Sequence, residues 1–295
     1  MKTNIIDYLE YLKTTKRLSD GTVDAYRSDI EKFFNFCISV GIKNPDKVKI
    51  EQINNYIKYM EDGGFSTSSV NRSVTAIKSY YKYLNKTGKT DKDITSGVRP
   101  IGQKTSQPVI LERDEVVKLL EAPSGDTFKA KRDKVMLELL YATGMKVSEL
   151  VELLPENVNL RFNLIKIESE RHERTVPIYP EAAKHLSEYI KVYRPAIADE
   201  GTKYLFTNLN GKQLSRQGIW KIIKHYAESA GITKTITPHT LRHSFAVHLL
   251  ENGADINDIK EMMGHLDISS TFYYSNMLKN KFNKGYAKFH PLSKR

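Results

Sequence analysis

Cysteine is almost absent from this chain, and long apolar runs are missing altogether. The single cysteine, Cys37, excludes a disulfide framework and any zinc site that needs several cysteines. No stretch approaches the run of about 18 apolar residues that spans a membrane. The N-terminal residues also lack the apolar segment of a signal peptide. We therefore expect a cytoplasmic protein with no membrane partner.

The common signatures of nucleotide-binding and hydrolytic enzymes are missing as well. The sequence contains no GxxxxGK phosphate loop, no GxGxxG, no HExxH and no GxSxG. Any phosphate chemistry must therefore proceed without a recognisable nucleotide-binding loop or metal-binding motif.

Positive charge is abundant in both halves of the chain. The 295 residues include 46 Lys and Arg against 35 Asp and Glu, a formal net charge of +11. Residues 1–105 contribute +6 of this and the remainder +5. Such a balance favours a polyanionic partner, most often nucleic acid. A generally basic surface with no such partner is the alternative.

Apolar periodicity predicts a mainly helical protein in two parts. Three- and four-residue spacing indicates helices at 22–38 and 68–85, and we expect further helical stretches near 113–121 and 127–141. Two β-prone runs, 164–167 and 175–178, predict a hairpin whose polar turn spans 168–174. A stretch rich in Pro, Gly and Ser separates the two parts. We predict an N-terminal domain at 1–94, a linker at 95–108 and a larger domain at 109–295, mostly helical with one small antiparallel sheet.

One C-terminal group of side chains has the parts for attack on a phosphodiester. His239 and Arg242 lie three apart in an expected helix, and His265 and Tyr274 follow. An arginine can bind two phosphate oxygens, and a histidine can move a proton. A phenol with an ordinary pKa of about 10 is a poor nucleophile and needs such neighbours. Taken singly, each residue also has an ordinary structural explanation.

Together these residues resemble the signature of the tyrosine site-specific recombinases, the phage integrase and Xer family. The resemblance rests on HTLRHSFAVHLL at 239–250, MGHLDISST at 263–271, ATGMKVSEL at 142–150, LSDGTVDAY at 18–26 and NRSVTAIKSYYKYL at 71–84. The segment GYAKFHP at 285–291 is similar to the tail of Xer proteins in particular. The resemblance implies a SAM-like, core-binding N-terminal domain and a recombinase catalytic domain.

The resemblance also implies a mechanism for site-specific recombination. The family clamps duplex DNA, with two protomers on each site and four in the synapse, and uses no metal or other cofactor. Tyr274 corresponds to the nucleophile that forms a 3′-phosphotyrosine. His239, Arg242 and His265 correspond to residues that activate the phosphate, and Glu149 to the acidic residue that organises the site. A related second recombinase is an alternative partner. Tyr273 is the alternative nucleophile, but the motif's nine-residue step from His265 selects Tyr274.

Two positions depart from the family pattern. The arginine of the first motif is Lys146, which keeps the charge but loses the bidentate fork. The hairpin turn lacks the family's catalytic lysine. Arg171 is our candidate for its role, with His172 and Lys166 as alternatives. The same turn could instead bind phosphate through Arg171 and Arg174.

The departures leave two functional hypotheses open. The first is an active but slow recombinase. The second is a catalytically impaired DNA-binding relative with an accessory or regulatory role. An introduced substitution at Lys146 is a third explanation for that position.

The resemblance places DNA contacts in both domains. Residues 214–226, LSRQGIWKIIKHY, match a helix that the family inserts in the major groove. Arg216 and Gln217 are the candidates for base reading, because arginine suits guanine and glutamine suits adenine. We assign Trp220 to the core. The predicted phosphate contacts of the N-terminal domain are Arg27, Arg72 and Lys78.

The last part of the chain resembles a segment that joins protomers in this family. Residues 277–289 match the segment that family members donate to a neighbouring protomer. The sequence does not distinguish chromosome resolution from integration or inversion.

Overall fold

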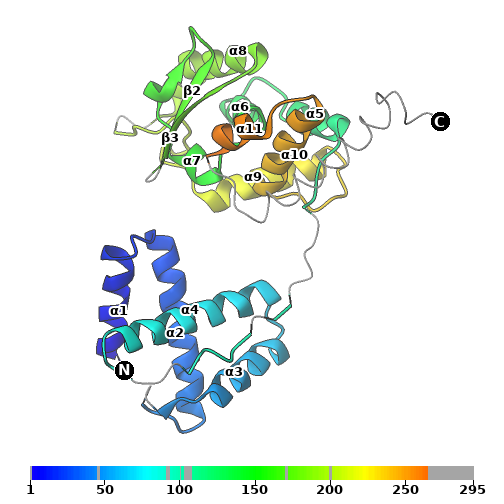
Figure 1. The fold of residues 1–295 in the computed structure, drawn as a ribbon. Helices are drawn as coiled ribbons and strands as arrows, with labels where there is room; N and C mark the ends of the chain where they lie inside the picture. Colours follow the sequence, from blue (N-terminus) through cyan, green and yellow to red (C-terminus); the bar gives the residue numbers. More distant parts are fainter. Residues whose placement is uncertain are drawn as a thin grey trace, which may run out of the picture. The chain divides into compact units, whose positions relative to one another are not determined.

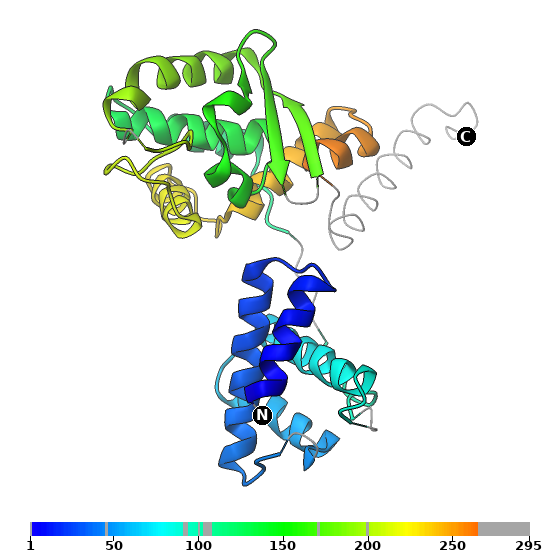
Figure 2. The same cartoon turned by 90° about the vertical axis from the view of Figure 1, so that its left-hand side faces the viewer.

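The chain folds into two compact units, Met1–Ser106 and Gln107–Arg295. The structure is a computed structural model that describes residues 2–44, 47–90, 94–99, 101–102, 108–169, 172–198 and 201–264. Figures 1 and 2 show the helices and strands of each unit. In the described part of the chain, no helix is long and apolar enough to cross a membrane.

The first unit is a bundle of helices. Its elements are α1 (Lys2–Thr14), α2 (Asp20–Ser39), α3 (Ile50–Asp62) and α4 (Thr67–Lys86). The predicted helices 22–38 and 68–85 correspond to α2 and α4, whose apolar residues pack together in the core and include Ile30, Phe33, Ile77 and Tyr80, each at most 1% exposed. Ser66 begins α4 as its N-cap by accepting a hydrogen bond from the Ser69 backbone N–H at 3.2 Å.

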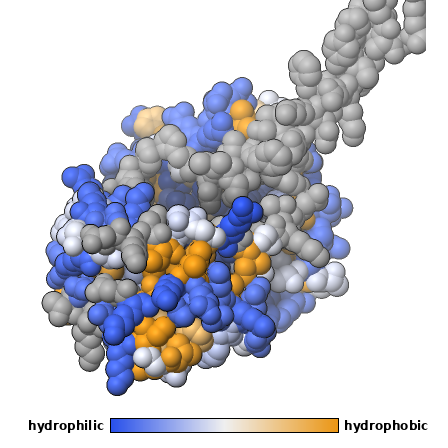
Figure 3. Space-filling model, turned by 60° about the horizontal axis from the view of Figure 1, so that its bottom comes forward, coloured by the Kyte–Doolittle hydropathy of each residue, from blue (hydrophilic) through white to orange (hydrophobic). Residues whose placement is uncertain are grey.

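The surface of the described residues alternates between hydrophilic and apolar areas. Figure 3 shows one face, on which hydrophilic residues surround a few apolar patches. Exposed large apolar side chains of the first unit include Ile6, Tyr59 and Phe65. Scattered apolar residues of this kind are ordinary on a protein surface, so we attach no function to them.

The second unit is built around one helix that is buried on nearly every side. Further helices and one small sheet surround this helix. Its helices are α5 (Arg113–Glu121), α6 (Phe128–Thr143), α7 (Val147–Glu152), η2 (Pro155–Asn157), α8 (Pro180–Glu188), η3 (Tyr189–Tyr193), η4 (Arg194–Ala196), α9 (Arg216–Ser229), α10 (Pro238–Glu251) and α11 (Ile256–Met263). The buried helix is α6, which packs against α8 and α10. The predicted mainly helical fold with a small sheet is therefore confirmed.

The sheet is antiparallel and has three strands in the order β1-β2-β3. These are β1 (Val158–Asn159), β2 (Leu164–Ser169) and β3 (His172–Pro177). The predicted hairpin is confirmed, but its turn is shorter than the predicted 168–174, because Ser169 pairs with His172. Strand β3 lies beside α11, as Figure 2 shows. The contact of β3 with α11 therefore places the hairpin beside the end of α11, where Arg174 donates to the Met262 carbonyl.

Candidate active site

The segment between α6 and α7 turns sharply, and this turn positions Lys146. Gly144 ends α6 in the left-handed region at φ +60°, and a Cβ there would overlap the Phe245 ring. Thr143 supports the turn by accepting a hydrogen bond from the Met145 backbone N–H at 3.2 Å. Lys146 follows as the N-cap of α7, with an exposed side chain. The chain therefore presents the Lys146 ammonium to solvent at the start of a helix.

Arg242 connects this turn to the end of α11. It is 8% exposed and lies on α10, which begins after Thr237 with Pro238 in the first turn. Its Nη1 donates to the Gly144 carbonyl, and its Nη2 donates to the Met263 carbonyl at 2.6 Å. Three of the motifs singled out in the sequence therefore meet at one guanidinium.

Arg174 makes a second connection between the same two places. Its Nη1 and Nη2 donate to the two carboxylate oxygens of Glu149 at 2.9 and 2.8 Å, and its Nε donates to the Met262 carbonyl at 2.6 Å. Both side chains of this ion pair are almost fully buried, at 6% and 5% exposed. Glu149 also accepts a hydrogen bond from the Lys146 backbone N–H at 2.7 Å. Arg174 and Arg242 together form what we call the double brace.

The pair sets the charge state of Glu149. Burial alone would raise the pKa of this carboxyl. Hydrogen bonds from Arg174 and the Lys146 backbone, together with the Arg174 charge, outweigh burial and hold the pKa below its ordinary value of 4.5. Glu149 is therefore ionised at neutral pH and can keep Arg174 in place.

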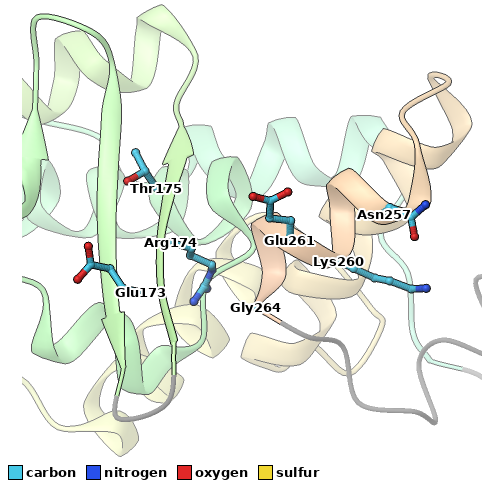
Figure 4. A pocket seen from close by; sticks show the side chains of 7 residues that line it. All are labelled: Glu173, Arg174, Thr175, Asn257, Lys260, Glu261 and Gly264. Carbon is cyan, nitrogen blue, oxygen red and sulfur yellow. The ribbon is translucent and has the colours of Figure 1, made fainter.

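A pocket of about 720 Å³ lies next to the double brace, between β3 and α11. Figure 4 shows Arg174 and its neighbours on the β3 side and Lys260 and Glu261 on the α11 side. Gly264, at φ +65°, closes one end, and a Cβ there would come within 2.9 Å of Arg174 Nη1. A side chain at this position would collide with the Arg174 guanidinium, which its pairing with Glu149 holds in place.

Two histidines lie on the same end of α10 as Arg242. His239 is exposed, and its ring centroid is 6.4 Å from that of the half-buried His243. Burial first, and then the neighbouring His239 and Arg242, lower the pKa of His243 below 6.5. His243 is thus neutral at pH 7, whereas His239 faces solvent. In the described part of the chain, no group of three His, Cys, Asp or Glu residues could hold a metal ion.

Comparison with known proteins identifies the family. Residues 110–281 match the phage integrase family, and residues 5–88 match the N-terminal SAM-like domain of phage integrases. The chain is 41% identical over 293 residues to tyrosine recombinase XerD of Staphylococcus epidermidis, with 99% of each chain covered. XerD of Staphylococcus aureus gives the same identity and coverage. The chain belongs to the tyrosine recombinases of the phage integrase family. It is therefore a DNA-cleaving and DNA-rejoining enzyme of the XerD-like kind.

Solved structures of tyrosine recombinases share this fold. XerA recombinase is 28% identical, with a TM-score of 0.55 and coverage of 98% of this chain and 99% of that one. A lambda integrase dimer bound to a core site gives 16% identity, a TM-score of 0.71 and coverage of 93% and 94%. The Tn1549 transposon integrase in complex with circular-intermediate DNA is 19% identical, with a TM-score of 0.73 and coverage of 92% of this chain and 94% of that one. The last two likenesses concern the fold alone.

Several residues that we predicted for the recombinase site lie outside the described residues. These are Arg171, His265, Tyr273, Tyr274 and the segment 277–289. The structure describes the backbone of His172, at the start of β3, but not its side chain. The brace contacts end at Met263, two residues before His265.

Two of the hairpin alternatives for phosphate chemistry are occupied by other contacts. The Lys166 ammonium lies 2.9 Å from Glu168 and 3.2 Å from Glu173. Arg174 is held by Glu149 and does not extend from the turn. The alternation along β3 could have revealed this, because Arg174 alternates with exposed residues in step with the buried Val176. A buried charge needs hydrogen-bond or ion-pair partners, and sequence reasoning missed the pairing of Arg174 with Glu149.

The predicted phosphate contacts of the first unit differ in their surroundings. Arg72 donates from Nε and Nη2 to the buried Asp29 at 2.8 and 3.1 Å, which ties α4 to α2. Its guanidinium is therefore already engaged in a structural ion pair, although half of the side chain is exposed. Arg27 is half exposed and lies 4.0 Å from Asp24. Lys78 is partly exposed and has no ion pair among the described residues.

Helix α9 presents its predicted base-reading residues to solvent. Arg216 and Gln217 are exposed in its first turn, where Ser215 caps the helix by accepting from the Gly218 N–H at 3.0 Å. The assignment of Trp220 to the core was wrong, since 45% of this side chain is exposed. Its neighbours Ile219 and Ile223 fill the core instead. Trp220 borders the buried stripe of α9 instead of lying within it, so its apolar character did not place it in the core.

Proposed function

We propose that the chain cuts DNA through Tyr274 and holds the broken end as a 3′-phosphotyrosine. His239, Arg242 and His265 act on the scissile phosphate, and Lys146 contributes a second positive charge. The observation that supports this most directly is the contact of Arg242 with Gly144 and Met263. This contact fixes the guanidinium relative to the turn that presents Lys146 and to the residues just before His265. Fixed donors of this kind stabilise developing charge without reorganisation.

We propose in addition that Lys146 makes cleavage slow. An ammonium is a single point of charge, whereas the arginine usual at this position in the family offers two parallel donors. Losing one contact specific to the transition state costs about 2.7–4 kcal/mol, by analogy with an oxyanion donor. The exposed position of Lys146 leaves space for the longer guanidinium.

The proposed substrate is a duplex recombination site occupied by two protomers, with four protomers in the synapse. The basic charge on both units and the exposed first turn of α9 support DNA as the partner. The similar lambda integrase is described as a dimer bound to a core site. Residues 277–289 are the proposed connection between protomers, with a second related recombinase as the alternative partner.

Covalent capture on nicked suicide duplexes tests the proposed chemistry. A library of candidate sites is incubated with the wild-type chain, and protein–DNA adducts are separated on a denaturing gel. We expect an adduct that disappears in Tyr274→Phe and persists in the matched control Tyr273→Phe. Loss in the control instead would assign the nucleophile to Tyr273. Binding without any adduct would favour the accessory DNA-binding function.

A further inference from the structure

The exposed face of α9 combines cations with one large aromatic ring. Arg216, Lys221 and Lys224 are exposed there, and Glu228, the carboxylate on this face, lies 3.7 Å from Lys224. Trp220 lies among them and is the only tryptophan in the chain. Within the part of the chain that the structure describes, no hydrogen bond or ring contact ties its indole to another residue. A large ring exposed among cations calls for a partner that is both anionic and partly apolar.

Helical spacing puts Trp220 on the same face as the base-reading candidates. It lies four residues after Arg216 and three after Gln217, so the three side chains are neighbours on the helix surface. The adjoining face of the helix is anchored in the core, where the Tyr226 hydroxyl donates to the buried Asp133 at 3.1 Å. Ile219 and Ile223 fix the rotation of the helix from the same side. Trp220 lies at the edge of this anchored face and remains 45% exposed.

We propose that Trp220 is a specificity-determining residue that reads a thymine in the major groove of the recombination site. This inference rests on the proposed function, since it needs duplex DNA as the substrate. It adds a base contact beyond those expected of Arg216 and Gln217.

The chemistry of the indole selects thymine among the four bases. An indole offers one N–H donor beside an apolar ring, and it has no acceptor. In the major groove, thymine offers the O4 acceptor beside the C5 methyl, the one apolar group on any base edge there. Guanine and adenine also offer acceptors, but they have no apolar group, and cytosine offers a donor that the indole cannot accept.

The single tryptophan makes the contact directly measurable in the full-length chain. A bound duplex site is first selected from a random library with the wild-type chain. Acrylamide quenching of tryptophan fluorescence is then compared with and without that duplex, in the Tyr274→Phe background so that no strand is cut. All the tryptophan emission comes from Trp220, and excitation near the red edge of indole absorption avoids the tyrosines. We expect the duplex to protect the indole from quenching, and unchanged quenching would overturn the proposal.

Deoxyuridine identifies the thymine, because it removes only the C5 methyl. Each thymine of the selected duplex is replaced singly, and affinity is measured for the wild type and Trp220→Ala. We expect one position at which the replacement weakens wild-type binding about fourfold, as for one buried methyl group. Trp220→Ala should bind both duplexes equally at that position. Equal fourfold losses in both proteins would refute a contact between the indole and that methyl.

A matched control and the adduct assay separate the possible failures. Phe162 is an exposed aromatic residue outside α9, and Phe162→Ala should keep both wild-type affinity and the deoxyuridine effect. An adduct that depends on Tyr274, together with normal specificity in Trp220→Ala, would overturn this inference and leave the proposed function intact. If the library yields no bound duplex, both proposals fail.

Discussion

At the scale of single residues, one buried ion pair and the buried Arg242 hold the site together. Arg174 and Glu149 are each nearly inaccessible, so each depends on the other to offset the cost of leaving water. Their hydrogen bonds also reach the Lys146 backbone and the Met262 carbonyl. Removing either partner should therefore lower the stability of the fold, and any loss of cleavage activity should follow from that change.

The first prediction concerns this pair. Arg174→Met leaves the Glu149 carboxylate buried without its partner, so the free energy of unfolding should fall by about 3–5 kcal/mol. Urea denaturation measures the change. The exposed pair Lys184 and Glu181 provides the control, and Lys184→Ala should change stability by less than about 0.5 kcal/mol. Equal effects of the two substitutions would show that the buried pair does not brace the fold.

The second prediction concerns pH. The pKa of Glu149 is lowered in the folded chain, so the unfolded chain takes up the proton first as pH falls. Its contribution to stability is therefore fully present above pH 4.5 and is lost as pH falls through the folded-state pKa. The stability difference between the wild type and Glu149→Gln, measured by urea denaturation, should shrink on acidification below pH 4.5. A constant difference across that range would contradict the assignment.

At the scale of helices and strands, the sequence predicted the elements well and their contacts less well. Periodicity located α4 within one residue at each end, because its apolar residues face the core at regular steps, and the predicted helical stretch at 113–121 is α5. The short turn between β2 and β3 was predicted too long, because polar residues near a hairpin tip look alike whether paired or not. Trp220 was misplaced because apolar character alone does not decide which helix face is buried.

The third prediction separates two cations of α4. Arg72→Ala leaves the buried Asp29 without its partner, so unfolding should become easier by about 2–3 kcal/mol. Lys78→Ala should leave stability unchanged within about 0.5 kcal/mol and lower only DNA affinity. Thermal or urea denaturation together with a binding titration distinguishes them. Unchanged stability in Arg72→Ala would show that Arg72 has no structural role and would favour its predicted role as a phosphate contact.

At the scale of the whole molecule, the candidate site was only partly predictable. The motifs that carry Lys146, His239 and Arg242 were visible in the sequence, because their spacing is local. The pairing of Arg174 with Glu149 joins β3 to α7, and a contact between residues 25 apart leaves no local spacing to recognise. The roles of His265 and Tyr274 remain predictions.

The fourth prediction follows from the charge of both units. Binding of DNA by this basic chain should release counterions, so affinity should fall steeply as salt rises. Each phosphate contact contributes about 0.9 to the slope of log affinity against log salt. Lys78→Ala should reduce the slope by about 1 in a titration from low to moderate salt. A flat salt dependence of the wild type would contradict a clamp on the DNA backbone.

The central claim is that Tyr274 cuts DNA at a phosphate site weakened by Lys146. Single-turnover cleavage of a suicide duplex by the wild type and Lys146→Arg tests it most directly, with Tyr274→Phe as the blank. The account predicts an adduct in both active chains, formed about a hundred to a thousand times faster in Lys146→Arg. Equal rates in the two chains, or no adduct in either, would contradict it.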